Sequence, residues 1–569
     1  MKGRRRARLI AVARGDEAPD LVVEGAQVFS AFTREWLAGD VAIADGMIAG
    51  VGAFEGGERI DARGKWLVPG FIDAHMHVES SKLTPAEFAR AVLPHGTTAI
   101  VCDPHEVANV LGSDGVHWML DASEGLPVTM FVMAPSCVPA SAFESPRREL
   151  TVGDMEAILR RRRALGVAEM MNFPGVIAGD PDVLAKLEVH GASHADGHAP
   201  GVVGRALDAY AAAGIRSDHE ATALEEALER RRRGLWVLIR EASNARNLRA
   251  LLPLVSRYGP ERCAFCTDDR EPDFLLHEGH INQMCRVAVA EGIAPEDALV
   301  MATLHPALAH GLEGHGAIAP GFRADLVLLD DLASFSPSLV VAGGRVAARD
   351  GRAEPFDAPE VPAHVLQTVR SAPLTDADLA LSVNGASRVR VIEIVPEQLI
   401  TIAREAETGR GLPDPARDIA KIAVIERHHA TGRVGVGLVS GFGLRGGAFA
   451  STVAHDAHNV VAVGAADADI LACVRRLQEL GGGCVVADGG SVVGELPLPV
   501  AGLLSGEPVE EVVGRLERLH ELLRGLGVAV PAPFMTLSFL ALSVIPALKI
   551  TDRGLVDVER FEIVPLGVA

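Results

Sequence analysis

The sequence is poor in aromatic residues and in positive charge. Only 4% of its 569 residues are aromatic, and 54 Lys and Arg face 75 Asp and Glu, which gives a net charge of −21. A surface of this sign repels phosphate backbones and anionic lipid. We therefore expect neither nucleic acid nor membrane partners. The basic runs at residues 4–6, 160–163 and 230–233 are interpreted as solvated faces, the last two at helix ends.

Cysteine is also scarce, and no long apolar run is present. Seven cysteines form an odd, scattered set, and the sequence shows no secretory leader. Cys263 and Cys266 have the spacing of a zinc knuckle but lack a second pair, so we do not expect them to bind metal. No apolar run reaches the roughly 20 residues that span a bilayer. These features predict a cytoplasmic protein with free thiols. A homodimer is expected from base rates alone.

Two separated stretches carry the pattern of a small sheet domain. Residues 20–66 contain short alternating segments around Asp45-Gly46, which is a hairpin signal. The same pattern returns in residues 317–352. We predict that residues 1–66 and 317–352 are the two halves of one small β-sandwich, with the chain between them inserted as a separate domain.

The inserted segment, residues 67–316, alternates apolar strands with amphipathic helices. Helices are expected near residues 85–92, 154–163, 223–231 and 244–252. About eight strand–helix units in this length predict an α/β fold, a TIM-like (β/α)8 barrel. A doubly wound open sheet is the alternative, but no glycine-rich phosphate loop follows the first strand. The predicted strands begin at Trp66, Thr97, Val128, Val167, His194, Gly214, Trp236 and Cys263.

A third unit follows the barrel. Residues 353–371 read as a linker because Pro355, Pro359 and Pro362 lie among acidic residues. Residues 372–569 combine strands, glycine-rich turns and a long helix near residues 508–526. We predict a C-terminal α+β domain.

The strongest chemical motif is His75-Met-His77, at the end of an apolar strand. Residues i and i+2 of a strand point to the same side. Barrel enzymes place their sites at the carboxyl ends of the strands, so two converging imidazoles there are well placed to bind a divalent cation. Ordinary polar histidines at a strand end are the alternative.

Other predicted strands end in good metal ligands. These are Glu169, His198, His219 and Asp268. Four imidazoles and two carboxylates suffice for a binuclear site, and mixed nitrogen and oxygen ligation suits Mn, Fe or Zn. Such a site would supply hydroxide near neutral pH, and Asp268 would then take its proton and pass it to the leaving group.

The motifs resemble the amidohydrolase superfamily, and the longer sequence resembles the bacterial adenine deaminases within it. The resemblance covers most of the chain and reaches its C-terminal part, which makes it more specific than the His-x-His pair. It rests on residues 69–112, 169–175, 196–201, 239–243, 267–270, 316–332, 437–459 and 537–555.

The resemblance implies hydrolytic deamination of adenine to hypoxanthine and ammonia, in purine salvage, by a metal pair with Mn or Fe preferred. It implies that His75, His77 and Asp268 bind one metal, while His198 and His219 bind the other. Glu169 would bridge the metals where many relatives use a carboxylated lysine, since the sequence has no lysine there.

Contacts with the substrate are predicted after the second barrel strand. Asp103 and Glu106 could present carboxylates to purine nitrogens, and Glu106 could protonate a ring nitrogen. A turn with local capping is the alternative. Arg240 is expected in a structural ion pair, and Asp269 should face away from the site if the strand alternates.

A second histidine pair, His455 and His458, lies in the C-terminal part. It lacks partners at defined spacing. We therefore expect either a polar cluster that stabilises the fold or a loop that reaches the barrel mouth.

Three departures from the family pattern, Ala457, Asn282 and His305, leave the exact substrate open. Another amidohydrolase acting on a cyclic amide or on a substituted 6-aminopurine is one alternative. A metal- or purine-binding protein without turnover is the alternative from a different class. The predicted proton shuttle at Asp268 argues against it, because a pure binder needs none.

Overall fold

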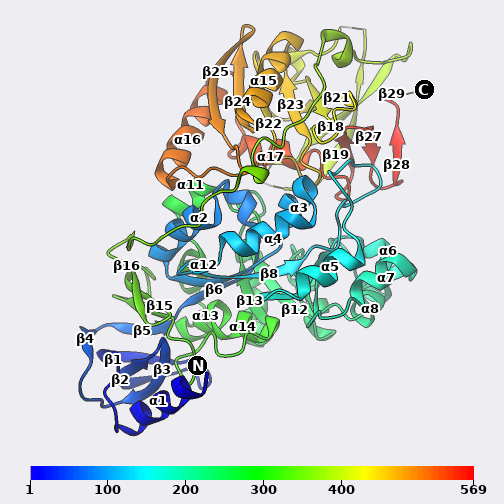
Figure 1. Ribbon diagram of the computed structural model, residues 1–569. Coiled ribbons are helices and arrows are strands. Elements are labelled where there is room, and N and C mark those ends of the chain that lie inside the picture. Colours follow the sequence, from blue (N-terminus) through cyan, green and yellow to red (C-terminus); the bar gives the residue numbers. More distant parts are fainter. Residues whose placement is uncertain (1, 397, 410, 569) are drawn as a thin grey trace.

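Eight parallel strands close into a barrel at the centre of the computed structural model, which describes residues 2–396, 398–409 and 411–568 (Figure 1). Strands β6 to β10 form one sheet and β11 to β13 another. Bridges between Ala195 and Ile215 and between Met76 and Asp268 join the two sheets into a ring. The predicted barrel is confirmed, and the open sheet is excluded. The strands are β6 (Phe71–Met76), β7 (Thr97–Cys102), β8 (Thr129–Ala134), β9 (Ala164–Met170), β10 (Ala195–Gly197), β11 (Ser217–Asp218), β12 (Trp236–Arg240) and β13 (Cys263–Cys266).

Helices surround the barrel and turn their apolar faces inward. In α10, Leu248, Leu251, Leu252 and Val255 are buried at helical spacing. The helices are α2 (Pro85–Val92), α3 (His105–Leu111), α4 (Ser113–Ala122), α5 (Val152–Leu159), α6 (Phe173–Ala178), α7 (Pro181–Leu187), α8 (Gly204–Ala212), α9 (Leu224–Arg232), α10 (Leu248–Tyr258), α11 (Pro272–His277), α12 (Ile281–Ala290), α13 (Pro295–Ala302) and α14 (Leu304–His310).

The basic run at the end of α9 is only partly a solvated face. Arg230 is fully buried, forms an ion pair with Asp218 and donates a hydrogen bond to the carbonyl oxygen of Ala199. The interpretation of this run as solvated is therefore wrong for Arg230, whose guanidinium ties α9 to the end of β11.

The small sheet is built from the two segments that come before and after the barrel in the sequence. Strand β5 pairs antiparallel with β14, with Val68 opposite Val327. Asp45 and Gly46, both with positive φ, turn the chain between β2 and β3. One apolar core contains side chains from both halves. The elements are α1 (Lys2–Arg14), β1 (Leu21–Ser30), β2 (Glu35–Ala44), β3 (Met47–Gly52), β4 (Glu58–Asp61), β5 (Trp66–Pro69), β14 (Leu326–Leu329), β15 (Pro337–Ala342), β16 (Arg345–Arg349) and β17 (Arg352–Ala353).

Gly70 separates the small sheet from the barrel. The single strand predicted from Trp66 is two strands, β5 in the small sheet and β6 in the barrel. A Cβ atom on Gly70 would lie 2.1 Å from Thr98 Oγ1. Only glycine therefore allows the chain to pass so close to β7 as it enters the barrel.

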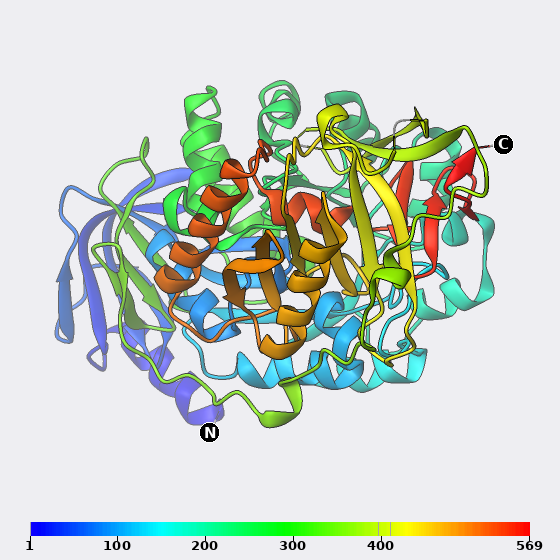
Figure 2. The same ribbon diagram turned by 90° about the horizontal axis from the view of Figure 1, so that it is seen from above.

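The C-terminal domain is α+β, as predicted, and lies over the barrel (Figures 1 and 2). Its main sheet has the strand order β19-β18-β21-β20-β23-β22-β24-β25, and β26 to β28 form a smaller sheet. The elements are β18 (Arg388–Ile394), β19 (Thr401–Glu407), β20 (Ala420–Ile425), β21 (Val434–Ser440), β22 (Ala448–Ser451), β23 (Val460–Gly464), α15 (Asp467–Leu480), β24 (Gly483–Asp488), β25 (Ser491–Pro497), α16 (Val509–Gly525), α17 (Pro533–Phe539), β26 (Leu548–Thr551), β27 (Gly554–Asp557), β28 (Glu562–Val564) and β29 (Gly567–Val568).

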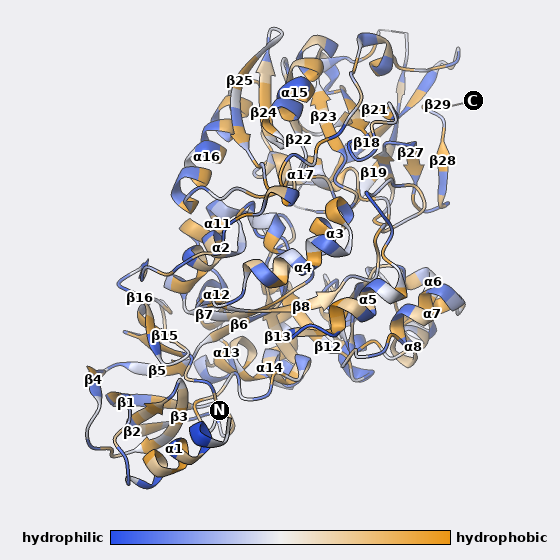
Figure 3. Cartoon of the chain, viewed as in Figure 1, coloured by the Kyte–Doolittle hydropathy of each residue, from blue (hydrophilic) through white to orange (hydrophobic). Residues whose placement is uncertain are grey.

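Apolar residues concentrate on the strands of the barrel and of the C-terminal sheet (Figure 3). Ile72, Val101 and Met133 belong to one of the clusters that fill the barrel, and Leu238 and Cys266 belong to another. The barrel is therefore a packed core, and its chemistry is confined to the strand ends. Among the described residues, none of the helices has the length and apolar character needed to cross a membrane.

Candidate active site

The six predicted metal ligands converge at the carboxyl ends of the barrel strands. His77 Nε2 lies 3.4 Å from Glu169 Oε1 and 3.2 Å from Asp268 Oδ1. His198 Nδ1 and His219 Nε2 lie 2.8 and 3.3 Å from Glu169 Oε2. The sixth side chain, His75, stacks on His219 with the ring centroids 4.3 Å apart, and its Nε2 lies 3.5 Å from Asp268 Oδ1. All six are at least nine-tenths buried.

Glu169 lies at the centre of this group. One of its carboxylate oxygens faces His77, and the other faces His198 and His219. Burial raises the pKa of Glu169, but the nearby imidazoles outweigh burial and hold the pKa well below its ordinary value. The carboxyl group is thus ionised and has one oxygen on each side of the site.

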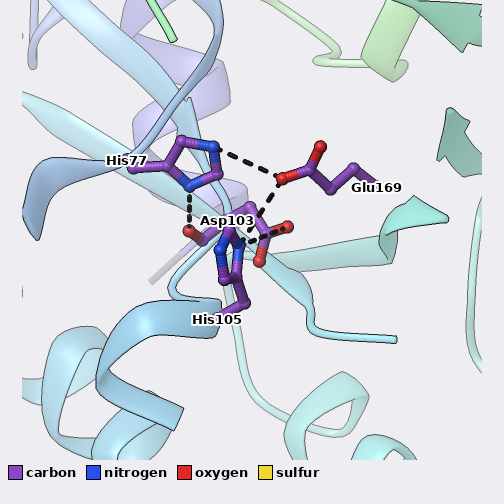
Figure 4. Close-up of side chains that lie close together, drawn as sticks. All are labelled: His77, Asp103, His105 and Glu169. Atoms are coloured by element: carbon purple, nitrogen blue, oxygen red, sulfur yellow. Dashed lines mark hydrogen bonds and ion pairs between the residues drawn. The ribbon is translucent and has the colours of Figure 1, made fainter. Parts of the chain in front are cut away.

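The hydrogen bond of His77 indicates what the site can hold. Its Nδ1 donates to the carbonyl oxygen of Asp103 at 2.9 Å (Figure 4). In the neutral ring, Nε2 then carries a lone pair, yet it faces two carboxylate oxygens. The lone pair of Nε2 and the two carboxylate oxygens repel one another, and a cation bound between them would remove this repulsion. Backbone carbonyls commonly orient metal-binding histidines in this way.

One further nitrogen fits the same interpretation. His75 Nε2 is buried, faces Asp268 and has no hydrogen-bond partner among the described residues. Two triads, His75 with His77 and Asp268 and His75 with Glu169 and His219, each bring three potential ligand atoms within 4.8 Å of one another. Imidazole nitrogen mixed with carboxylate oxygen suits a divalent transition metal.

Asp103, His105 and Glu106 follow β7, as predicted. His105 Nδ1 lies 3.3 Å from Asp103 Oδ2 and 3.6 Å from Glu169 Oε1 (Figure 4). Glu106 Oε1 lies 3.2 Å from Ser80 Oγ and 3.6 Å from His455 Nδ1. His105 lines the cavity beside the predicted ligands, whereas Asp103 and Glu106 lie outside its lining.

Two further charged residues face the predicted ligands, and sequence reasoning did not assign them to the site. Glu220 Oε1 lies 3.5 Å from His219 Nε2. Arg240 forms ion pairs with Glu220 and Asp268, and its Nη1 lies 2.9 Å from Asp268 Oδ2. Arg240 is therefore in an ion pair, as expected, but the pair is part of the cavity wall. The position of Glu220, directly after His219, was the available signal.

Asp269 lines the cavity, and the expectation that it faces away is wrong. Asp268 has a φ of 56°, in the left-handed region, so the alternation of a strand does not continue past β13. Asp269 accepts a hydrogen bond from Ser80 Oγ at 2.5 Å.

The C-terminal domain closes the cavity. It contributes the apolar side chains of Leu399, Phe539, Leu542 and Ile545, together with the polar His455 and Asp456. Of the two expectations for the second histidine pair, the loop that reaches the barrel mouth is correct. The free volume is about 20 Å³, which is room for about one water molecule, so a larger substrate requires the wall to open.

A second pocket, of about 320 Å³, adjoins this cavity. The two share Glu220, Arg240, Leu399 and Ile545 as wall residues. The rest of the second pocket is lined by barrel loops and by the C-terminal residues 398–400 and 544–546. We call this second pocket the vestibule.

Similarity to known proteins extends over nearly the whole chain. Residues 66–347 match the amidohydrolase family, and residues 396–562 match the adenine deaminase C-terminal domain. The chain is 46% identical to adenine deaminase 2 of Carboxydothermus hydrogenoformans, over 98% of this chain and 99% of that relative. It is 48% identical to an adenine deaminase of Cereibacter sphaeroides with the same coverage of both chains. The chain belongs to the adenine deaminase family.

Solved structures are more distant. A beta-aspartyl dipeptidase from Fervidobacterium islandicum AW-1 covers 59% of this chain and 99% of its own, with a TM-score of 0.46 and 17% identity. This likeness is too remote to bear on the reaction. In this adenine deaminase family member, the domain that matches the adenine deaminase C-terminal domain is the one that supplies His455 and Asp456 to the cavity.

The three departures from the family pattern lie outside the cavity lining. Asn282 donates to the carbonyl oxygen of Phe335, and His305 Nδ1 donates to that of Cys263. The Ala457 amide donates to Glu144 Oε2 at 3.2 Å. All three have structural contacts, so they give no reason to expect a different substrate.

Proposed function

We propose that this chain catalyses the hydrolytic deamination of adenine at C6, which gives hypoxanthine and ammonia. The observation that carries the proposal is the arrangement of four imidazoles and two carboxylates under a C-terminal domain of the adenine deaminase type. Full-length similarity to proteins named adenine deaminases supports the choice of substrate.

The metal site in this proposal is binuclear, with Mn or Fe preferred and Zn as a further candidate. His75, His77 and Asp268 would hold one ion and His198 and His219 the other, with Glu169 shared between them. The separate oxygens of Glu169, one toward each side, support this assignment. When bound, the ions supply Lewis-acid activation of water.

Asp268 is the proposed proton carrier. It accepts a proton from the attacking water as the water oxygen bonds to C6, and it delivers the proton to the amino group as the C6–N bond breaks. Arg240 holds one Asp268 oxygen at 2.9 Å, which leaves the other toward His75 and His77. Burial raises the pKa of Asp268, but His219, His75, His77 and Arg240 outweigh it, so the group is ionised and ready to accept.

Asp103 and Glu106 remain the proposed polar groups on the purine side. Asp103 holds His77 through its carbonyl oxygen, and Glu106 lies against His455. Burial raises the pKa of Glu106, which favours a carboxyl group that keeps its proton and can supply it to a ring nitrogen. Because His105 and His455 line the cavity in front of them, we propose that their contact with substrate needs the opened wall.

We further propose a cytoplasmic enzyme of purine salvage that forms a homodimer. All seven cysteines are free and buried, which supports a reducing compartment. The dimer rests on the frequency of two-fold association among large enzymes.

The test is ammonia release from adenine by protein prepared with manganese, beside the metal-stripped protein. A panel of adenosine, cytosine and dihydrouracil controls for specificity. Release from adenine that depends on metal supports the proposal. If adenine releases no ammonia and dihydrouracil is hydrolysed, the proposed deamination is wrong and hydrolysis of a cyclic amide takes its place.

A further inference from the structure

A loop of the C-terminal domain, residues 452–459 between β22 and β23, enters the mouth of the barrel. Its Asp456 is 1% exposed and lines the same cavity as His77 and Glu169. Asp456 follows Glu169 by more than 250 residues in the sequence. The carboxylate therefore faces the predicted metal ligands from the opposite domain.

One oxygen of Asp456 is engaged and the other is free. Asp456 Oδ1 lies 3.4 Å from His105 Nε2 and 3.6 Å from His455 Nδ1. Oδ2 is buried and has no hydrogen-bond partner among the residues that the structure describes. A buried acceptor without a donor is costly, and such groups usually meet a ligand or a water molecule.

The loop is fixed from several sides. The His455 amide donates to Ser538 Oγ at 3.2 Å, and the His455 ring stacks on Phe539 with centroids 4.5 Å apart. The Ala457 amide donates to Glu144 Oε2, and the Ala457 carbonyl accepts from His428 Nε2 at 2.7 Å. The free oxygen of Asp456 is thus held in place before any ligand binds.

The proposed reaction determines which part of the substrate meets this loop. The amino-bearing C6 must lie at the metal ligands, so the imidazole half of adenine points away from them. In the free base this half carries a ring N–H, which is a donor. In a nucleoside the same nitrogen is bonded to the sugar and has no hydrogen to donate.

We propose that Asp456 Oδ2 accepts the ring N–H of the free base, and that this contact makes the enzyme select adenine over 9-substituted adenines. The inference rests on the proposed function. His105 and His455 act as positioning residues that hold the other oxygen of Asp456. A 9-substituent would leave Oδ2 without a donor and would need space where Leu542 and Ile545 close the cavity.

The experiment compares adenine with 9-methyladenine, in which a methyl group replaces the hydrogen on the ring nitrogen. The full-length, manganese-loaded protein is assayed beside Asp456→Ala and Asp456→Asn. We expect wild type to prefer adenine by about 100-fold or more in kcat/KM, because a site built for an N–H rejects an analogue without it. Asp456→Ala should lower this preference by about tenfold, and Asp456→Asn, which keeps an oxygen acceptor, should lower it less.

Glu144→Gln is the matched control. Glu144 holds the same loop at Ala457 but does not line the cavity. Metal content and melting temperature confirm that each variant is folded and loaded. An equal change of preference in Glu144→Gln would attribute the effect to displacement of the loop and overturn the role of Asp456.

Failure of the two proposals can be told apart. No ammonia from adenine with wild type would overturn the proposed function, and this inference with it. Activity of wild type on adenine, with the same preference in wild type and Asp456→Ala, would overturn the recognition role alone.

Discussion

Arg240 donates from a single guanidinium nitrogen to both Glu220 and Asp268. The three side chains are at most 5% exposed. Burial by itself raises the pKa of Glu220, but Arg240, His198 and His219 outweigh burial and hold this pKa below its ordinary value. The guanidinium is thus a fixed positive charge that two buried carboxylates share.

Replacing this charge should destabilise the fold. In Arg240→Gln, Glu220 and Asp268 lose their counter-charge inside the protein, which is a costly arrangement. The melting temperature of the metal-stripped protein should fall. In the double variant Arg240→Gln/Glu220→Gln one buried charge is removed as well, and part of the loss should be recovered. A double variant no more stable than the single one would show that charge balance is not the reason.

Asp268→Asn separates proton transfer from metal binding. The amide keeps the shape of the side chain but cannot take a proton, so kcat for adenine should fall by about 10²–10⁴-fold. Most of the metal should remain, because the other five predicted ligands are intact. Metal analysis beside the ammonia assay checks both expectations. Asp208→Asn, an exposed partner of Arg233, is the control and should match wild type.

Glu169→Gln should lose metal as well as turnover. Its two carboxylate oxygens face histidines on both sides of the site, and the amide supplies a neutral oxygen on one side only. Metal analysis after dialysis should find less metal than in Asp268→Asn. Full occupancy in Glu169→Gln would remove this residue from the bridging position.

The barrel could be predicted from local pattern because its strands are short apolar runs between helices. Strands β7, β12 and β13 begin at Thr97, Trp236 and Cys263, as expected. The strand from Trp66 was predicted as one because its apolar run is continuous. Its division depends on the close approach of Gly70 to Thr98, which is a contact between two strands and leaves no trace in local hydropathy.

The candidate site, too, could be predicted only in part from local sequence. His75 lies near the end of β6, His77 and Asp268 come just after strands, and the strand ends bring the three together. Asp456 was not predicted as a site residue. The sequence left the segment around His455 and His458 as either a polar cluster or a loop at the barrel mouth, and only the packing of the C-terminal domain on the barrel decides between them. Glu220 was missed for a local reason: β11 has only two residues, so strand alternation says nothing about the side chain two positions later.

The vestibule suggests the route by which substrate reaches the closed cavity. Ile400 is 49% exposed on its rim, so a larger side chain there can be accepted without disturbing the core. Ile400→Trp should lower kcat/KM for adenine several-fold while metal content stays at the wild-type value. Leu308→Trp, on the barrel exterior and 57% exposed, is the control. Equal activity of both variants would exclude the vestibule as the route.

Lys549 connects two segments of the cavity wall and should make stability depend on pH. Its Nζ donates to the carbonyl oxygens of Leu399 and Phe539, at 2.7 and 3.0 Å. Burial lowers the pKa of Lys549 to about 7, from an ordinary value of 10.5.

Between these two pKa values the unfolded chain binds a proton that the folded chain does not bind. Stability from this group therefore rises with pH across that window, is complete above 10.5 and is lost as the pH falls through about 7. Lys549→Met removes the titration and nearly preserves the volume. The difference in melting temperature between wild type and Lys549→Met should shift in favour of wild type from pH 7 to pH 10, and a constant difference would show that the amine keeps its proton when buried.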